Sequence, residues 1–204
     1  VLVHCDCVQG FGKILFSLNR IKADMATMSS HKIHGPKGCG AIYVREGVNV
    51  RPLCFGGSQE SKVRPGTENV PGIAAFGHAS LKALRDIREN WEHVKELNLY
   101  LTDCLRQMED VVINSPSGAV PYVLNISVLP FATEELLHEM RMRGIYLSGS
   151  SACEKGARSH VIRAMGIEGP RADSVVRIGL GKKNTREEVT VLVETLNELI
   201  KRGK

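Results

Sequence analysis

Short apolar runs, separated by glycine-rich and polar connections, fill the first part of the chain up to about residue 88. The runs VLVH (residues 1–4) and GAIYV (40–44) have the length and composition of buried strands. ADMATM (23–28) is a third candidate strand. This alternation of strands and connections predicts an α/β arrangement for the first part of the chain.

The pattern changes to a helical one after residue 72. Apolar residues then recur mostly at steps of three or four positions, which is the spacing of an amphipathic helix. Gly77 interrupts the pattern, so we predict one long helix, or two in succession with Gly77 as the weak point. An element of this length suits a link between a larger and a smaller domain. The apolar positions are Ile73, Phe76, Leu81, Leu84, Ile87, Trp91, Val94, Leu97, Leu101 and Leu105.

The remaining residues predict the order strand, strand, helix, loop, helix, strand, helix. YVLNISVL (122–129) and SVVRIGLG (174–181) have strand composition. We see no internal repeat and no low-complexity segment. The chain is therefore predicted to contain an α/β part followed by a smaller α+β unit.

Polar residues and glycines mark the expected ends of two helices in this second part. Thr133 is suited to cap the helix EELLHEMRMR, and Gly144 is suited to end it. Asn184, with Glu187 three residues later, resembles a capping box before the last helix.

Composition and charge narrow the function classes. The chain has 204 residues, of which 43% are hydrophobic and 24% charged, as in an ordinary globular protein. The net charge of +5 comes from residues interspersed along the chain, so nucleic-acid binding is not predicted. No apolar run approaches the ~20 residues of a membrane span. The first residues are not a secretory signal and lack an initiator methionine, so we expect the chain to begin inside a longer protein.

The cysteines are scattered in the sequence, at positions typical neither of a disulfide scaffold nor of a zinc site. Cys5 and Cys7 flank Asp6, which leaves open a metal pair or a reduced pair beside a strand. We favour the reduced pair, no metal, and a cytoplasmic location. The six cysteines are Cys5, Cys7, Cys39, Cys54, Cys104 and Cys153.

Two segments near predicted strands carry candidate chemistry. Asp6 follows the first strand, where α/β sheets present ligand-binding groups, and it either pairs with a cofactor ring nitrogen or caps the next turn. In SSHKIHGPKGCG (29–40), Ser29 and His31 offer donors to an anion, and Lys32 offers an amine that burial would activate. A solvated basic loop is the alternative for this second segment.

Two further loops are candidates for function. GGSQESKVRPGTENVPG (56–72) is long, polar and without periodicity, and it contains Thr67. YLSGSSACEKGARSH (146–160) places Cys153 among small residues, with Lys155 and Arg158 nearby. An electropositive, accessible loop favours a reactive thiol, whereas packing as a small apolar residue is the alternative for Cys153.

Five motifs in order resemble those of the pyridoxal-phosphate-dependent cysteine desulfurases, in the class V aminotransferase group of fold type I enzymes. HCDCVQGFGK is similar to the His-x-Asp-x-x-Gln segment of this family, SSHKIHGPKGCGAIYVR to its cofactor-lysine segment and RPGTENVPGIAA to its Arg-x-Gly-Thr segment. SGSSAC resembles its mobile nucleophile loop, and VVRIGLG resembles its substrate-carboxylate strand. The resemblance extends over essentially the whole chain.

The resemblance implies a division of the chain. Residues 1–88 would be part of the large pyridoxal-phosphate-binding domain with its mixed sheet, whose N-terminal half is absent. Residues 89–204 would be the linking helix and the smaller α+β domain.

The resemblance also implies a set of cofactor contacts. Lys32 would hold pyridoxal 5′-phosphate covalently, while Ser29 and His31 would hold its phosphate. Asp6 would pair with the ring nitrogen, and Gln9 would hydrogen-bond the ring hydroxyl.

Three further implications concern the substrate and the assembly. Arg177 would bind the substrate carboxylate as a bidentate pair. Cys153 would attack the substrate sulfur, so that L-cysteine becomes L-alanine and a persulfide forms on Cys153. Thr67 would reach the cofactor phosphate of a neighbouring subunit, which implies a homodimer. A sulfur acceptor or an iron–sulfur scaffold protein would then receive the sulfur.

Two alternatives stay open at this point. The chain could be a non-catalytic remnant that acts by dimerising or by binding a partner, which cofactor uptake would distinguish. It could also be a related lyase that acts on selenocysteine, and paired assays with the two substrates would separate these activities.

Overall fold

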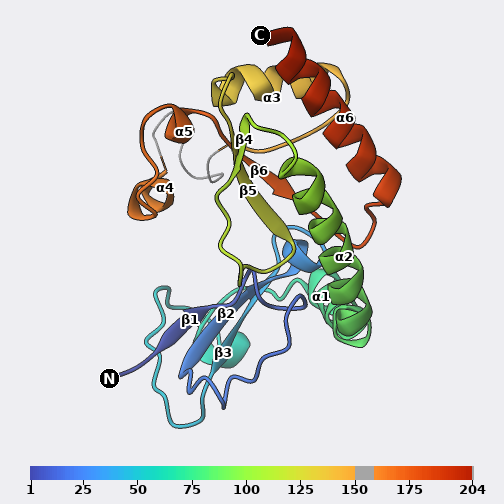
Figure 1. Ribbon diagram of the computed structural model, residues 1–204. Helices are drawn as coiled ribbons and strands as arrows, with labels where there is room; N and C mark the ends of the chain where they lie inside the picture. The colour runs from blue at the N-terminus through green and yellow to red at the C-terminus, as the bar shows by residue number, and fades with distance from the viewer. Residues whose placement is uncertain (150–158, 204) are drawn as a thin grey trace. The chain divides into compact units, whose positions relative to one another are not determined.

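The computed structural model describes residues 1–149 and 159–203. The chain divides into two compact units, Val1–Trp91 and Glu92–Lys204 (Figure 1). Each unit is described by itself below. The prediction for Cys153 lies outside the described residues.

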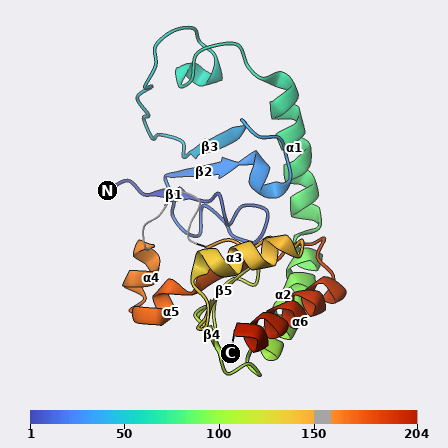
Figure 2. The ribbon, with the colours of Figure 1, turned by 90° about the horizontal axis from the view of Figure 1, so that it is seen from above.

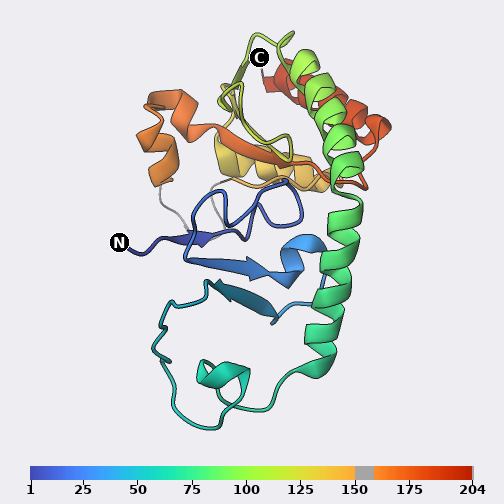
Figure 3. The same ribbon diagram turned by 90° about the horizontal axis from the view of Figure 1, so that it is seen from below.

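The first unit contains a small mixed sheet. Its strands are β1 (His4–Asp6), β2 (Met25–Ser29) and β3 (Gly40–Val44), in the order β1-β2-β3. β1 pairs with β2 in parallel, and β2 pairs with β3 in antiparallel (Figure 3). The predicted strand at residues 1–4 is wrong in its position, because pairing with β2 begins only at His4. β3 was expected to be buried, yet its first three residues are exposed.

Two helices complete this unit beside the carboxyl ends of β1 and β2. The 3-10 helix η1 (Ser30–Ile33) follows β2 directly and packs against α1 (Val70–Arg85) (Figures 2 and 3). Asn69 caps α1, because its Oδ1 atom accepts a hydrogen bond of 3.2 Å from the amide of Gly72. A short 3-10 helix, η2 (Glu60–Lys62), lies in the loop before α1. The small core of the unit consists of Ile33, Phe76 and Ala83, with Phe11, Met28, Cys39 and Ala79 packed against them.

The long helical pattern corresponds to two helices, α1 and α2 (Ile87–Leu105). The break lies at Asp86, so Gly77 as the weak point is wrong. The amide of Asp86 still donates to the carbonyl of Lys82, which closes the last turn of α1. Arg85 forms an ion pair with the carboxylate of Asp86 at 2.7 Å. Gly77 stays helical because the turns on both sides continue its hydrogen bonding.

The second unit is built on an antiparallel sheet of β4 (Val111–Ile113), β5 (Val123–Val128) and β6 (Val175–Gly179). β5 is the central strand, and the register places Ile126 opposite both Ile113 and Val176. The predicted strands at 122–129 and 174–181 are confirmed. Leu124, Ile126 and Val128 of β5 are buried at alternating positions, and Val175, Val176 and Ile178 of β6 are buried as well.

Four further helices belong to this unit: α3 (Thr133–Met142), α4 (His160–Ala164), α5 (Gly169–Asp173) and α6 (Arg186–Gly203). α2 and α6 run side by side (Figures 1 and 2). Tyr100 of α2 is hydrogen-bonded to Thr190 at 3.0 Å. The guanidinium of Arg186 lies 3.9 Å from the centroid of the Tyr100 ring. Buried core residues include Val94, Leu97, Leu101, Leu105, Val128, Leu136, Met140 and Leu196. A search of the described residues finds no helix with the length and apolarity of a membrane span.

The predicted helix ends are partly correct. Gly144 ends α3 in the left-handed region (φ 77°), and the next amide, of Ile145, donates to the carbonyl of Met140. Thr133 is not the cap of α3, because its hydroxyl donates instead to the carbonyls of Asp173 and Val175.

The capping box before α6 is shifted by one residue from the predicted pair. Thr185 Oγ1 accepts from the amide of Glu188, and Glu188 Oε2 accepts from the amide of Thr185. Asn184 instead donates from its side chain to Glu188 Oε2.

Candidate functional site

The candidate site lies in the first unit, where two parallel strands end. β1 ends at Asp6 and β2 ends at Ser29, with Asp6 opposite Thr27 in the register. Both strands run toward the side at which η1 and α1 lie (Figure 3). Ligands of α/β sheets bind outside the carboxyl ends of the strands, so this edge is the place for the predicted chemistry.

Asp6 is exposed at the end of β1 and caps the turn that follows. Its Oδ1 atom accepts a hydrogen bond of 2.9 Å from the amide of Val8. This contact is the turn cap, one of the two alternatives that the sequence left open for Asp6. Within the described part of the chain, Oδ2 forms no hydrogen bond, so this oxygen is available to an N–H donor.

Ser29, His31 and Lys32 lie together around the start of η1. Ser29 Oγ and His31 Nδ1 are 2.7 Å apart, so the hydroxyl and the imidazole form one polar group. Lys32 is half-buried, and its amine has neither a hydrogen bond nor an ion pair with another described residue. His34 ends η1 in the left-handed region (φ 67°), which turns the chain away and leaves Lys32 on the last turn of the helix.

Contacts between Ser30 and Gly35 determine the backbone shape of η1 and the turn after it. Ser30 is fully buried, and its hydroxyl oxygen has no hydrogen-bond partner among the described residues. The amide of Gly35 donates to the carbonyl of Ser30 at 3.0 Å. A Cβ atom at Gly35 would lie 2.1 Å from Ser30 Oγ, so only glycine fits at this position.

Gln9 has a partner that the sequence reasoning missed. Lys13 Nζ donates to Gln9 Oε1 at 3.0 Å. Burial, followed by the nearby charge of Lys32, lowers the pKa of the Lys13 amine. In the sequence, the signal for this contact was the spacing of four residues between Gln9 and Lys13. A single lysine that follows a glycine is equally typical of an exposed surface, so this spacing did not identify Lys13 as a site residue.

One neighbouring thiol is unsuited to nucleophilic chemistry. Cys7 is buried directly after β1, and burial together with a side-chain contact to Cys5 raises its pKa to about 11. The thiol is therefore protonated at neutral pH, and Cys7 acts as a packed apolar residue. The other cysteines of residues 1–149 and 159–203, like Cys7, are free thiols, and no cluster suited to a metal ion is found in these ranges.

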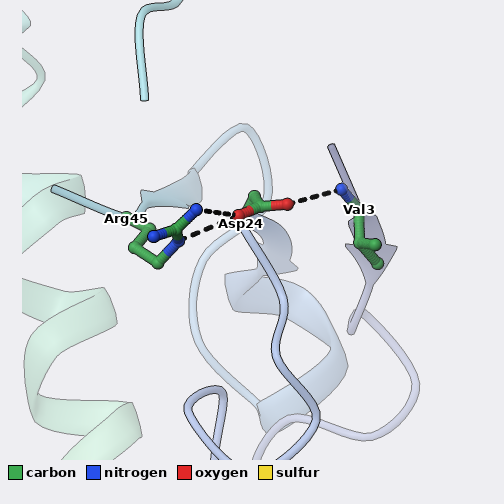
Figure 4. Close-up of polar contacts among 3 residues, drawn as sticks. All are labelled: Val3, Asp24 and Arg45. Atoms are coloured by element: carbon green, nitrogen blue, oxygen red, sulfur yellow. Dashed lines mark hydrogen bonds and ion pairs between the residues drawn. The ribbon is translucent and has the colours of Figure 1, made fainter. Parts of the chain in front are cut away.

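An ion pair holds the far end of the same sheet (Figure 4). Arg45 Nε donates to Asp24 Oδ1 at 2.8 Å, and the amide of Val3 donates to Asp24 Oδ2 at 2.7 Å. These contacts, the amide of Val3 first, lower the pKa of Asp24. These contacts join Val3 before β1, Asp24 before β2 and Arg45 after β3, so they stabilise the sheet rather than taking part in the site.

The remaining predicted residues lie elsewhere. Thr67 is exposed in the loop before α1. Arg177 is half-buried in β6 of the second unit, where its backbone pairs with Asn125 and with Ser148. The structure thus gathers Asp6, Gln9, Ser29, His31 and Lys32 at one sheet edge, whereas Thr67 and Arg177 are placed by other segments.

The residues at this edge fit pyridoxal 5′-phosphate. A hydroxyl, an imidazole and a pair of amines are suited to anionic oxygens, and a carboxylate oxygen is available to a ring N–H. The amine of Lys32 is half-buried and has no hydrogen bond or ion pair with another described residue, so it is suited to covalent attachment of an aldehyde. This donor set would hold a phosphorylated aromatic aldehyde better than a metal ion.

The chain matches a known protein family. Residues 1–192 match the family described as aminotransferase class-V, and the chain belongs to that family. Cysteine desulfurase IscS of Methanosarcina thermophila is 34% identical to it, in an alignment covering 99% of this chain and 51% of the relative. These matches confirm the resemblance predicted from the five motifs.

Solved structures agree with this assignment. A NifS-like protein has a TM-score of 0.90 and 37% identity, covering 99% of this chain and 53% of that chain. The structure described as SspA in complex with cysteine has a TM-score of 0.69 and 27% identity, covering 91% and 52%. The predicted mixed α/β fold class is confirmed. The chain spans about half the length of the relatives that it matches.

Proposed function

We propose that this chain carries the cofactor-binding and nucleophilic residues of a pyridoxal-phosphate-dependent cysteine desulfurase. The observation that carries the proposal is the cluster of Asp6, Ser29, His31 and Lys32 at the carboxyl ends of two parallel strands. The names of the similar proteins support L-cysteine as the substrate, since one relative is a cysteine desulfurase and one similar structure is described with cysteine.

Each residue at the strand ends has a distinct task in this proposal. Ser29 and His31 bind the phosphate, and Asp6 accepts the hydrogen bond of the ring N–H through its available oxygen. Lys32 attaches the cofactor and then moves the proton at the substrate Cα. When bound, pyridoxal phosphate supplies an electron sink for the negative charge that forms at Cα.

The sulfur step belongs to Cys153. Its thiolate attacks the sulfur of L-cysteine, so that an S–S bond forms on Cys153 and the Cβ–S bond of the substrate breaks. The carbon skeleton keeps the electron pair, takes up protons and leaves as L-alanine, while Cys153 is oxidised to a persulfide. Arg177 binds the substrate carboxylate during this step.

The assembly is part of the same proposal. Thr67 lies in an exposed loop, where a hydroxyl can reach the cofactor phosphate of a second subunit in a homodimer. The persulfide would pass to a sulfur acceptor, such as an iron–sulfur scaffold protein. A reducing compartment keeps such a thiol from forming disulfides, and the cytoplasm is the compartment that we propose.

Covalent trapping tests the cofactor site directly. The purified chain is mixed with pyridoxal phosphate, reduced with borohydride and mapped by peptide mass spectrometry. We expect one reduced adduct on Lys32, which is lost in Lys32→Arg and kept in Lys37→Arg, a matched variant of an exposed lysine in the same segment. Labelling spread over surface lysines, or none, would overturn the proposed site.

A second measurement tests the nucleophile. In the presence of a thiol reductant, the chain is given L-cysteine, and alanine and sulfide are measured. Cys153→Ser should abolish sulfide release while the adduct on Lys32 is retained. Sulfide release at the wild-type rate by Cys153→Ser would show that another group accepts the sulfur. Parallel assays with selenocysteine separate a desulfurase from a selenocysteine lyase.

A further inference from the structure

Lys13 occupies a fixed place beside the candidate site. After β1, the amides of Gly10 and Phe11 donate to the carbonyl of Cys7, and the amides of Lys13 and Ile14 donate to the carbonyl of Gly10. These consecutive turns determine the backbone position of Lys13. The Lys13 side chain therefore extends from a backbone segment that these hydrogen bonds hold in place.

Gly12 brings this stretch against η1. Gly12 has a positive φ of 70°, and a Cβ atom there would lie 2.7 Å from Ile33 Cγ2 and 3.0 Å from Ala83 Cβ. The backbone before Lys13 thus touches the residue that follows Lys32. This close approach holds the two lysines near each other, and only glycine permits it.

The contact with Gln9 determines the orientation of an amide. An ammonium group has donors and no acceptor, so the Gln9 atom that meets Lys13 Nζ at 3.0 Å is the oxygen. The amide nitrogen of Gln9 then points away from Lys13 and is free to donate. Without Lys13, either end of the exposed Gln9 side chain could face a ligand.

We propose that Lys13 is a positioning residue for the candidate site, which holds Gln9 Oε1 so that the Gln9 amide nitrogen donates to the ring oxygen of the cofactor. This inference rests on the proposed function. Burial and the charge of Lys32 lower the pKa of the Lys13 amine, and the hydrogen bond to Gln9 offsets part of this cost to the ammonium.

A double-mutant cycle on cofactor affinity tests the proposal. The dissociation constant of pyridoxal phosphate is measured by absorbance titration for the wild-type chain, Lys13→Met, Gln9→Ala and the double variant. We expect each single variant to bind about tenfold more weakly, since one charge-assisted hydrogen bond is lost. The double variant should bind no more weakly than Gln9→Ala, because Lys13 acts through Gln9.

Controls separate positioning from folding and from bulk charge. Lys82→Met removes an exposed lysine from α1 and should leave the affinity unchanged. Lys13→Arg keeps the donor to Gln9 and should recover most of the affinity. Additive losses in the double variant, or an equal loss in Lys82→Met, would overturn the proposal.

A measurement without cofactor distinguishes failure of the inference from failure of the proposed function. The side-chain amide signals of Gln9 are followed by NMR in the ¹⁵N-glutamine-labelled chain and assigned with Gln9→Ala. Lys13→Met should shift these signals, whereas Lys82→Met should not. Unchanged signals overturn the positioning by Lys13. A wild-type chain that binds no pyridoxal phosphate overturns the proposed function and the ligand contact of Gln9, even where the signals shift.

Discussion

The two units of the chain bury their apolar side chains to very different degrees. In the second unit, Leu101, Leu105 and Val128 are fully buried, and both α2 and α6 contribute buried side chains. In the first unit, the core is small, and Leu53 and Phe55 are 98% and 89% exposed. The candidate cofactor site lies in the unit with the weaker core.

This difference shows how the site is held. A large core fixes side chains by close packing from all sides, as in the second unit. The site in the first unit is held instead by local devices: Gly12 against Ile33, Gly35 against Ser30, and turns closed by backbone hydrogen bonds. We therefore expect substitutions of core leucines to act most strongly in the second unit and substitutions of glycines to act most strongly in the first.

The largest expected effect compares two leucines on successive helices. Leu101→Ala removes a fully buried side chain of α2 and should lower the free energy of unfolding by about 2–5 kcal/mol. Leu81→Ala removes a side chain of α1 that is 72% exposed and should change it by no more than about 0.5 kcal/mol. Urea unfolding followed by circular dichroism measures both. Equal losses would contradict the difference in burial between these two positions.

A smaller effect is expected at Gly35, which follows η1. Gly35→Ala forces a Cβ atom against Ser30 Oγ and should destabilise the chain by about 1–3 kcal/mol. Ser30→Ala should be neutral or stabilising, since it removes a buried hydroxyl without a partner among the described residues. Urea unfolding of both variants and of the double variant measures the coupling.

The outcome of this cycle depends on the proposed cause. If the clash with the hydroxyl is responsible, Ser30→Ala should recover most of the loss in the Gly35→Ala background. A double variant as unstable as Gly35→Ala would show that the backbone carbonyl of Ser30 or the side chain of Ala79 sets the limit instead.

The smallest expected effect is the pH dependence of the ion pair in the first unit. The pKa of Asp24 lies below its ordinary value of 3.8 in the folded chain, so the carboxylate stabilises the fold fully above that pH. The stabilisation is lost as the pH falls from about 4 toward the folded pKa. The stability difference between wild type and Asp24→Asn, measured by urea unfolding, should therefore shrink over that range. A difference that stays constant would exclude a contribution from ionised Asp24.

Much of the second unit could be predicted because its signals are local. The strand composition of YVLNISVL and the helical spacing before Leu105 predict a strand and a helix, and β5 and α2 confirm both. The ends of elements were harder to predict. Thr133 has the residue type of a cap, yet its hydroxyl bonds to Asp173 and Val175, which are distant in sequence. Local propensity does not include such partners.

The sequence predicted the residue types of the candidate site, but it predicted their geometry only in part. Asp6, Ser29 and Lys32 stand in motifs that short-range sequence patterns reveal. Lys13 was missed, because its significance depends on the orientation of Gln9 and on the approach of Gly12 to Ile33.

The sequence by itself determined the order of strands and helices, the motifs of the class V family and the residue types of the candidate site. These depend on periodicity, turn residues and spacing, which act over a few neighbouring positions. The tertiary structure alone decided which donors meet which acceptors, which glycines lie in close contact, and which lysine contacts Gln9. Those outcomes depend on where side chains lie in space, both for near neighbours such as Gln9 and Lys13 and for distant residues such as Gly12 and Ile33, and these positions are set only when each unit folds.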